Sequence, residues 1–255
     1  MDPLSISIRL TDGADGSAFN MKTVLHKAET RGRAEHGWLE SRHTFSFADY
    51  HDSERMGFGV LRVINDDIVA PGAGFGTHSH ANMEIISIPL SGSLRHQDSM
   101  GHTQVIRQGE VQIMSAGTGV SHSEYNASDS DPVNFLQIWV IPKQPHITPR
   151  YGQQEFPAEK REDRFQTVAA PGSEDAAVWI NQDAWFSLGN FSAGRRATYH
   201  RHSTGNGVYV FVLEGGAEVA GERLGRRDGI GITEAERIEI AAATDCELLV
   251  IEVPL

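Results

Sequence analysis

The chain has 255 residues, enough for one large or two small β domains, and its 39% hydrophobic and 22% charged residues are typical of a globular protein. Its formal net charge of −12 disfavours attraction to nucleic acid and to anionic membranes, so we expect no direct binding to either. No apolar run approaches the roughly 20 residues of a membrane span, and no apolar segment near the N-terminus suggests a secretory signal.

Short apolar runs follow one another along most of the chain. We interpret residues 1–20 as an N-terminal extension that need not be ordered. From Val60 onward, runs typical of β-strands are separated by Gly, Pro, Asp and Ser, and no long stretch has a convincing helical period. Examples are V-L-R-V-I-N, M-E-I-I-S-I, V-Q-I-M and N-F-L-Q-I-W-V-I. This pattern predicts an all-β protein, either a sandwich or a barrel.

A change in composition divides the chain. Residues 142–164 carry four prolines among many charges, and proline cannot donate to a sheet ladder. We therefore expect a first domain at residues 21–145, a linker at 146–165 and a second domain at 166–255. A weak internal repeat supports a duplicated fold, because a glycine precedes H-x-H by six positions at both His78 and His200. The single cysteine, Cys246, excludes an intrachain disulfide and fits a reducing, cytoplasmic compartment, with this residue buried in a strand.

Two pairs of ligand-type residues stand out. His78 and His80 are two positions apart, and so are His122 and Glu124. In a β-strand, residues i and i+2 point to the same face, about 7 Å apart along the strand. Two such strands side by side predict a site of three histidines and one carboxylate. Glu84 is a further carboxylate close in sequence, and spacing alone leaves it open as an alternative to Glu124.

The donor types restrict the bound metal. Imidazole and carboxylate ligands, with positions left for water or substrate, suit Fe(II), Mn, Ni, Cu, Co or Zn. A thiolate site is excluded because the chain has one cysteine. The spacing therefore predicts one divalent transition-metal ion without identifying it.

The residues around these pairs carry a family resemblance. The spacing Gly72-x5-His78-x-His80-x3-Glu84 resembles the first motif of the cupin superfamily, and Gly109-x5-Ser115 with His122-x3-Asn126 resembles the second. Ser115 stands where many cupins have proline. More narrowly, the chain is similar to the pirin family and its bacterial quercetinase-like members. The matching segments are R-H-T-F-S-F-A-D-Y, F-G-T-H-S-H-A-N-M-E, H-Q-D-S-M-G-H, S-A-G-T-G-V-S-H-S-E-Y-N and F-L-Q-I-W-V-I-P.

The resemblance implies a bicupin, two tandem antiparallel β-barrels of jelly-roll type with the metal in the N-terminal barrel. It implies that His78, His80, His122 and Glu124 bind the metal, with Fe(II) the expected ion, and that Glu84 does not. It also implies a quercetin 2,3-dioxygenase-type oxygenase, in which O2 cleaves the heterocyclic ring of a flavonol or related phenol. Glu124 would then act as base toward the substrate hydroxyl. The alternative is a metal-bearing, redox-sensing regulatory protein that binds a protein partner, and in either case we expect a monomer.

Other residues near the motifs have plainer interpretations. Packing in the barrel core is the preferred interpretation for His43, Phe45, Phe47, Gln137 and Trp139, with a place at the pocket the alternative. His96 and His102 flank the turn D-S-M-G and are expected to be exposed. No second H-x-E follows His200 and His202, so we expect surface or turn positions for that pair and no second metal site.

Overall fold

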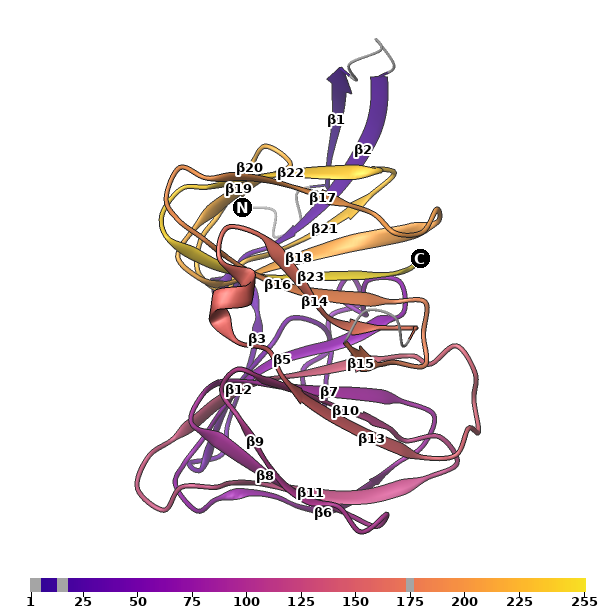
Figure 1. Ribbon diagram of the computed structural model, residues 1–255, viewed down its shortest axis with the longest axis vertical. Helices are drawn as coiled ribbons and strands as arrows, with labels where there is room; N and C mark the ends of the chain where they lie inside the picture. Colours follow the sequence, from indigo (N-terminus) through magenta and orange to yellow (C-terminus); the bar gives the residue numbers. More distant parts are fainter. Residues whose placement is uncertain (1–5, 13–17, 173–176) are drawn as a thin grey trace. The chain divides into compact units, whose positions relative to one another are not determined.

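The computed structural model describes residues 6–12, 18–172 and 177–255, with side chains from Met21 onward. The described chain is built almost wholly of β-strands, with two short 3-10 helices, η1 (Ala28–Thr30) and η2 (Ala158–Arg161). None of the described helices has the length and hydropathy that crossing a membrane requires. The chain forms two compact units, each with two antiparallel sheets (Figure 1).

The first unit contains residues 32–157 and 170–182. Its large sheet has the order β13-β10-β7-β12-β5-β4-β3 and its small sheet the order β6-β11-β8-β9, both antiparallel. The strands are β3 (Gly32–Glu35), β4 (Leu39–His43), β5 (Leu61–Val69), β6 (Gly74–His80), β7 (Glu84–Ser91), β8 (Ser93–Asp98), β9 (Thr103–Arg107), β10 (Glu110–Ser115), β11 (Val120–Asn126), β12 (Val133–Val140), β13 (Arg150–Glu155) and β15 (Val178–Trp179).

Apolar side chains fill the space between these two sheets. One core cluster joins Val69 and Phe135 of the large sheet to Leu94 and Ile106 of the small sheet. The small sheet can contribute side chains to this core because burial alternates along β8 (S-L-R-H-Q-D), where every second side chain is buried. The sheets face each other as in a jelly roll and do not close into one continuous barrel.

The second unit contains residues 158–169 and 183–255 with the described residues up to Arg31. Its large sheet has the order β1-β2-β21-β18-β23-β16-β14 and its small sheet the order β17-β22-β19-β20, again antiparallel. The strands are β1 (Ile6–Asp12), β2 (Ala18–His26), β14 (Phe165–Ala170), β16 (Trp185–Phe191), β17 (Arg196–His200), β18 (Asn206–Glu214), β19 (Ala217–Val219), β20 (Glu222–Leu224), β21 (Gly229–Thr233), β22 (Arg237–Ala242) and β23 (Cys246–Pro254).

The described N-terminal strands belong to the large sheet of the second unit. Strand β2 pairs with β21, with Lys22 opposite Thr233 and Val24 opposite Gly231 (Figure 1). We expected the first domain to begin at residue 21 and residues 1–20 to be an extension. Residues 6–12 and 18–20 form strand, and residues 1–5 and 13–17 lie outside the described part of the chain. Pairing with β2 gives β21 a neighbour on a side that would otherwise be an open edge.

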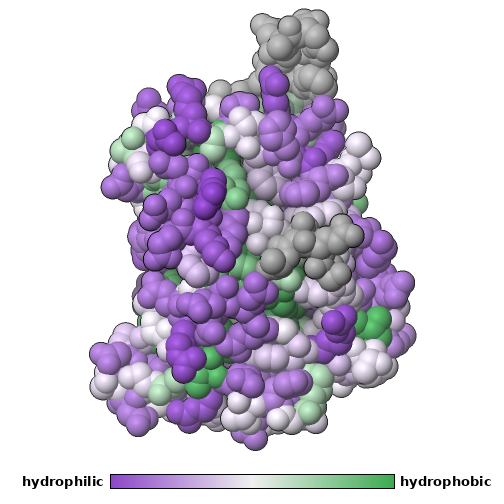
Figure 2. Space-filling model, in the orientation of Figure 1, coloured by the Kyte–Doolittle hydropathy of each residue, from purple (hydrophilic) through white to green (hydrophobic). Residues whose placement is uncertain are grey.

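Figure 2 shows a face covered mostly by polar side chains, with apolar ones scattered between them. Cys246 is buried on β23, as predicted, and burial raises the pKa of its thiol to about 11. A thiol that resists ionisation is a poor nucleophile, so this cysteine is a packing residue.

Candidate metal centre

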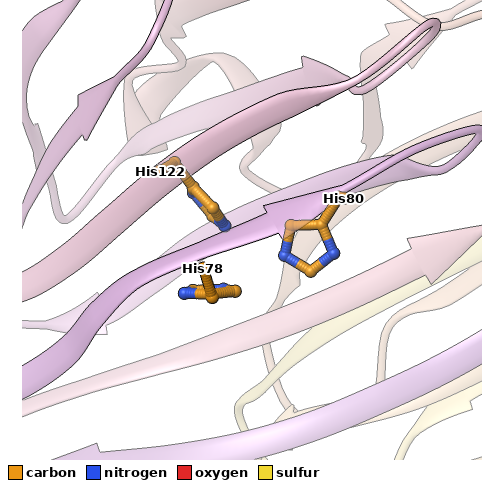
Figure 3. Close-up of side chains that lie close together, drawn as sticks. All are labelled: His78, His80 and His122. Carbon is orange, nitrogen blue, oxygen red and sulfur yellow. The ribbon is translucent and has the colours of Figure 1, made fainter.

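Three histidines from two neighbouring strands meet at one place. His78 and His80 lie on β6 and His122 lies on β11, with His122 directly opposite His78. All three side chains project from these strands toward one another (Figure 3). The ring of His78 lies 4.4 Å from that of His122 and 4.8 Å from that of His80, and the rings of His80 and His122 are 5.0 Å apart. The i, i+2 spacing and an antiparallel register produce this convergence.

The three imidazoles fit a metal ion. One ring nitrogen from each lies within 4.8 Å of the others. Both ring nitrogens of His122 are buried and have no hydrogen-bond partner. Burial, followed by the proximity of His78 and His96, lowers the pKa of His122 to about 3. For His80, burial is the largest cause and the proximity of His122 and His78 adds to it, which lowers the pKa to about 4. Both rings are therefore neutral near pH 7, which is the form that binds a metal.

Glu124, the fourth predicted ligand, belongs to a second group of ligand-type residues. It is buried on β11 two positions after His122, with a β-bulge between them. Its carboxylate accepts hydrogen bonds from Ser87 Oγ at 3.1 Å and from Gln137 Nε2 at 2.7 Å. The ligand group that includes Glu124 contains His122 and His96. The structure thus brings together three of the four predicted ligands in one group, and His122 links them to Glu124.

His96 was wrongly predicted to be an exposed turn residue. It lies on β8 opposite Glu124, is fully buried, and has its ring 5.4 Å from that of His122. Its Nε2 lies 3.0 Å from Asp98 Oδ2. Burial opposes ionisation of Asp98, but hydrogen bonds from His96 and His102 outweigh it and lower the pKa of that carboxyl. A sequence signal was available, because H-Q-D has the same i, i+2 spacing as the two ligand pairs.

Aromatic side chains line one side of the centre. The ring of Trp139 lies 5.0 Å from that of His80, and Phe47 packs edge-on against Trp139 at 5.3 Å. The indole Nε1 of Trp139 is buried and has no hydrogen-bond partner. The core interpretation preferred for Trp139 and Gln137 was therefore incomplete, since both contact the centre; Phe45 is a core residue as predicted. His80 also lines an open groove of about 380 Å³.

Glu84 has a different environment. It belongs to neither ligand group among the described residues. Its Oε2 accepts hydrogen bonds from Ser115 Oγ at 2.7 Å and from the backbone N–H of Asn181 at 3.1 Å. Burial raises its pKa to about 7 despite these hydrogen bonds. In this structure Glu84 is a buried packing residue.

The second H-x-H pair forms no comparable group in the described part of the chain. His200 and His202 are both exposed, as predicted. His202 stacks on Trp185 with ring centroids 4.8 Å apart, and its Nδ1 lies 2.9 Å from Glu252. Glu252 is fully buried and also accepts hydrogen bonds from Tyr199 Oη and from backbone N–H groups. His202 therefore has a structural role.

Comparisons with known proteins identify the family of this chain. The model of the family described as Pirin matches residues 24–140, and that described as Quercetinase C-terminal cupin domain matches residues 167–253. The quercetin 2,3-dioxygenase of Escherichia coli K12 is 42% identical over 234 residues, covering 90% of this chain and 98% of that protein. The pirin-like protein of Caulobacter vibrioides is 41% identical over 222 residues, covering 87% and 95%.

Solved structures show the same likeness. The bacterial pirin YhhW from Escherichia coli, in complex with nickel(II), has a TM-score of 0.86 and 40% identity, covering 91% of this chain and 99% of that chain. A further structure of YhhW has a TM-score of 0.87. These matches confirm the predicted all-β bicupin architecture.

Proposed function

This chain belongs to the pirin family, and from that premise we propose that it is a metal-dependent oxygenase that cleaves the ring of a flavonol or related phenol with O2. The observation that carries the proposal is the three-histidine group, whose donor atoms lie within 4.8 Å of one another beside an aromatic wall. Relatives named quercetin 2,3-dioxygenase, at 42% identity over 90% of this chain, support the substrate class.

We propose that His78, His80, His122 and Glu124 hold one divalent transition-metal ion, with Fe(II) the expected ion. Neutral imidazoles and a carboxylate suit such an ion, and a pirin of known structure is a nickel(II) complex. When bound, the ion supplies a Lewis-acid position at which a phenolic hydroxyl loses its proton more readily. The carboxylate of Glu124 lies with His96 and His122, and His122 is the histidine that the two ligand groups share.

The surrounding side chains orient a planar substrate. The faces of Trp139 and Phe47 can pack against an aromatic ring next to His80. The free Nε1–H of Trp139 can donate a hydrogen bond to an oxygen of that ring system. Ser87 and Gln137 keep Glu124 in place as an acceptor, so that one of its oxygens takes the proton from the substrate hydroxyl.

The proposal is tested by O2 uptake. Protein reconstituted with Fe(II) is mixed with quercetin in an oxygen electrode, and wild type is compared with Glu124→Ala and with the control Glu40→Ala, whose carboxylate is partly exposed on β4. We expect wild type and the control to consume O2 and quercetin together, and Glu124→Ala to lose at least about a hundredfold in rate, as is typical for loss of a general base. Equal rates for Glu124→Ala and wild type would refute the role of Glu124, and no uptake by wild type would refute the activity.

We further propose a cytoplasmic monomer, with a phenolic small molecule and O2 as its partners. The alternative, a metal-bearing regulatory protein, requires a protein partner, and the net charge of −12 would favour a basic one. Light scattering during size exclusion tests the monomer. A pull-down that retains one protein stoichiometrically, dependent on the oxidation state of the iron, would support the alternative.

A further inference from the structure

A second group of metal-ligand residues adjoins the three histidines. His96, His122 and Glu124 are all buried, and one donor atom from each lies within 4.8 Å of the others. They come from the two neighbouring strands β8 and β11, with His96 directly opposite Glu124. Two imidazoles and one carboxylate are the donor set typical of non-haem Fe(II) oxygenases. The group therefore has the composition of a metal site in its own right.

His96 is oriented as a ligand. Its Nε2 lies 3.0 Å from Asp98 Oδ2, while Asp98 Oδ1 accepts the backbone N–H groups of Met100 at 2.9 Å and His102 at 3.1 Å. This carboxylate acts as an acceptor, so the hydrogen-bond network assigns the ring proton of His96 to Nε2 and the lone pair to Nδ1. A metal-bound histidine commonly donates its other N–H to a carboxylate in this way.

No hydrogen-bond donor for the lone pair of His96 Nδ1 is found in the described structure. Nδ1 is buried and has no hydrogen-bond partner. The neighbouring Tyr151, whose ring lies 5.0 Å away, donates its hydroxyl to Gln153 Oε1 at 2.6 Å. A buried acceptor without a donor destabilises the fold, so a fold that positions one so firmly needs a compensating interaction. Coordination to a cation supplies that interaction.

We propose that Nδ1 of His96 is a metal ligand, and that His96, His122 and Glu124 form an inner position for a small divalent transition-metal ion. The outer position lies at His78 and His80 and also uses His122, and because a neutral imidazole has a single lone pair, the two positions are alternatives for one ion. This inference rests on the proposed function for the presence of a metal at His122. It adds a ligand that lies outside the set His78, His80, His122 and Glu124.

The test uses full-length wild-type protein labelled with ¹⁵N in its histidines and titrated with Zn(II) to saturation. A ring nitrogen with a free lone pair and one bound to zinc resonate in different ranges, so the ¹⁵N spectrum reports each ring separately. We expect the Nδ1 resonance of His96 to move from the free to the bound range while its Nε2–H remains. The readout is independent of turnover, and it reports the inner position separately from His78 and His80.

The outcomes separate the two proposals. If the resonances of His122 respond to Zn(II) and Nδ1 of His96 does not, the inner position is refuted and the proposed function stands. If no histidine of either group responds, the metal centre and the proposed function both fail.

A matched pair of variants provides a second measurement. His96→Gln retains a donor for Asp98 but has no imidazole, whereas His102→Gln alters the other histidine on Asp98, which belongs to neither group. Titration with Co(II), followed by its visible absorption, should show roughly tenfold or greater loss of affinity for His96→Gln and little change for His102→Gln. Equal affinities for the two variants, with both folded by circular dichroism, would overturn the proposal.

Discussion

Replacing the buried Glu84 with glutamine should remove a pH dependence from the stability of the protein. The side chain is 1% exposed, and burial raises its pKa from 4.5 to about 7. A carboxyl whose pKa is higher in the folded than in the unfolded state destabilises the fold as it ionises. The free energy of unfolding is thus highest below about pH 4.5, falls as the pH rises toward about 7, and is level above that.

The size of the effect follows from the same pKa. Raising it from 4.5 to about 7 corresponds to roughly 3 kcal/mol, at about 1.4 kcal/mol for each tenfold change in the ionisation constant. Glutamine resembles the protonated carboxyl and can still accept the hydrogen bonds of Ser115 and Asn181. Glu84→Gln should therefore match wild type at low pH and be more stable by up to about 3 kcal/mol near pH 8.

Urea unfolding between about pH 5 and pH 8 measures this difference. Burial also raises the pKa of Asp67 to about 7. Asp67 contributes equally to the pH dependence of stability in wild type and variant, so the difference between their free energies of unfolding reports Glu84 alone. Glu40→Gln, at a partly exposed carboxylate, serves as control and should follow the wild-type profile. The reasoning is refuted if Glu84→Gln is less stable than wild type near pH 8, or if the two profiles run parallel.

Three further substitutions probe the centre and the second unit. Trp139→Phe keeps a ring beside His80 but removes the unpartnered Nε1–H, so KM for quercetin should rise several-fold while the affinity for Zn(II), measured by calorimetry, stays unchanged. Gln137→Leu removes the 2.7 Å hydrogen bond to Glu124 and should weaken Zn(II) binding by about 10–100-fold; unchanged affinity would show that this hydrogen bond does not position the carboxylate. Glu252→Ala leaves several donors of the second unit without their acceptor and should cost about 3 kcal/mol or more in urea unfolding, without changing the Zn(II) stoichiometry.

Local sequence patterns were sufficient to predict the strands and the ligand pair His78 and His80. The i, i+2 spacing of His78 and His80 and the alternation of apolar residues depend only on strand geometry, which sequence reports directly. The same rule applied to H-Q-D would have identified His96, but the adjacent turn residues favoured an exposed position, and burial on β8 depends on the facing sheet.

Features that depend on distant parts of the chain were not predictable in this way. Strand β2 pairs with β21, far along the chain, and no local signal specifies that partner. The bulge between His122 and Glu124 changes the register at the point where the carboxylate must be aimed. Spacing alone therefore predicted that the carboxylate lies near the histidines, but not that its closest ligand neighbours would be His96 and His122.

The central claim is that the histidine group holds the ion required for O2-dependent cleavage of a flavonol. The most direct test measures bound metal by elemental analysis, and O2 and quercetin consumption, in the same samples of apo protein, Fe(II)-reconstituted protein and His122→Ala. His122 belongs to both ligand groups, so its loss should remove the bound ion. We expect consumption to rise in proportion to bound iron in wild type, and both iron and activity to be lost in His122→Ala. Activity in the apo protein equal to that of the reconstituted protein, or full activity in His122→Ala, would contradict the claim.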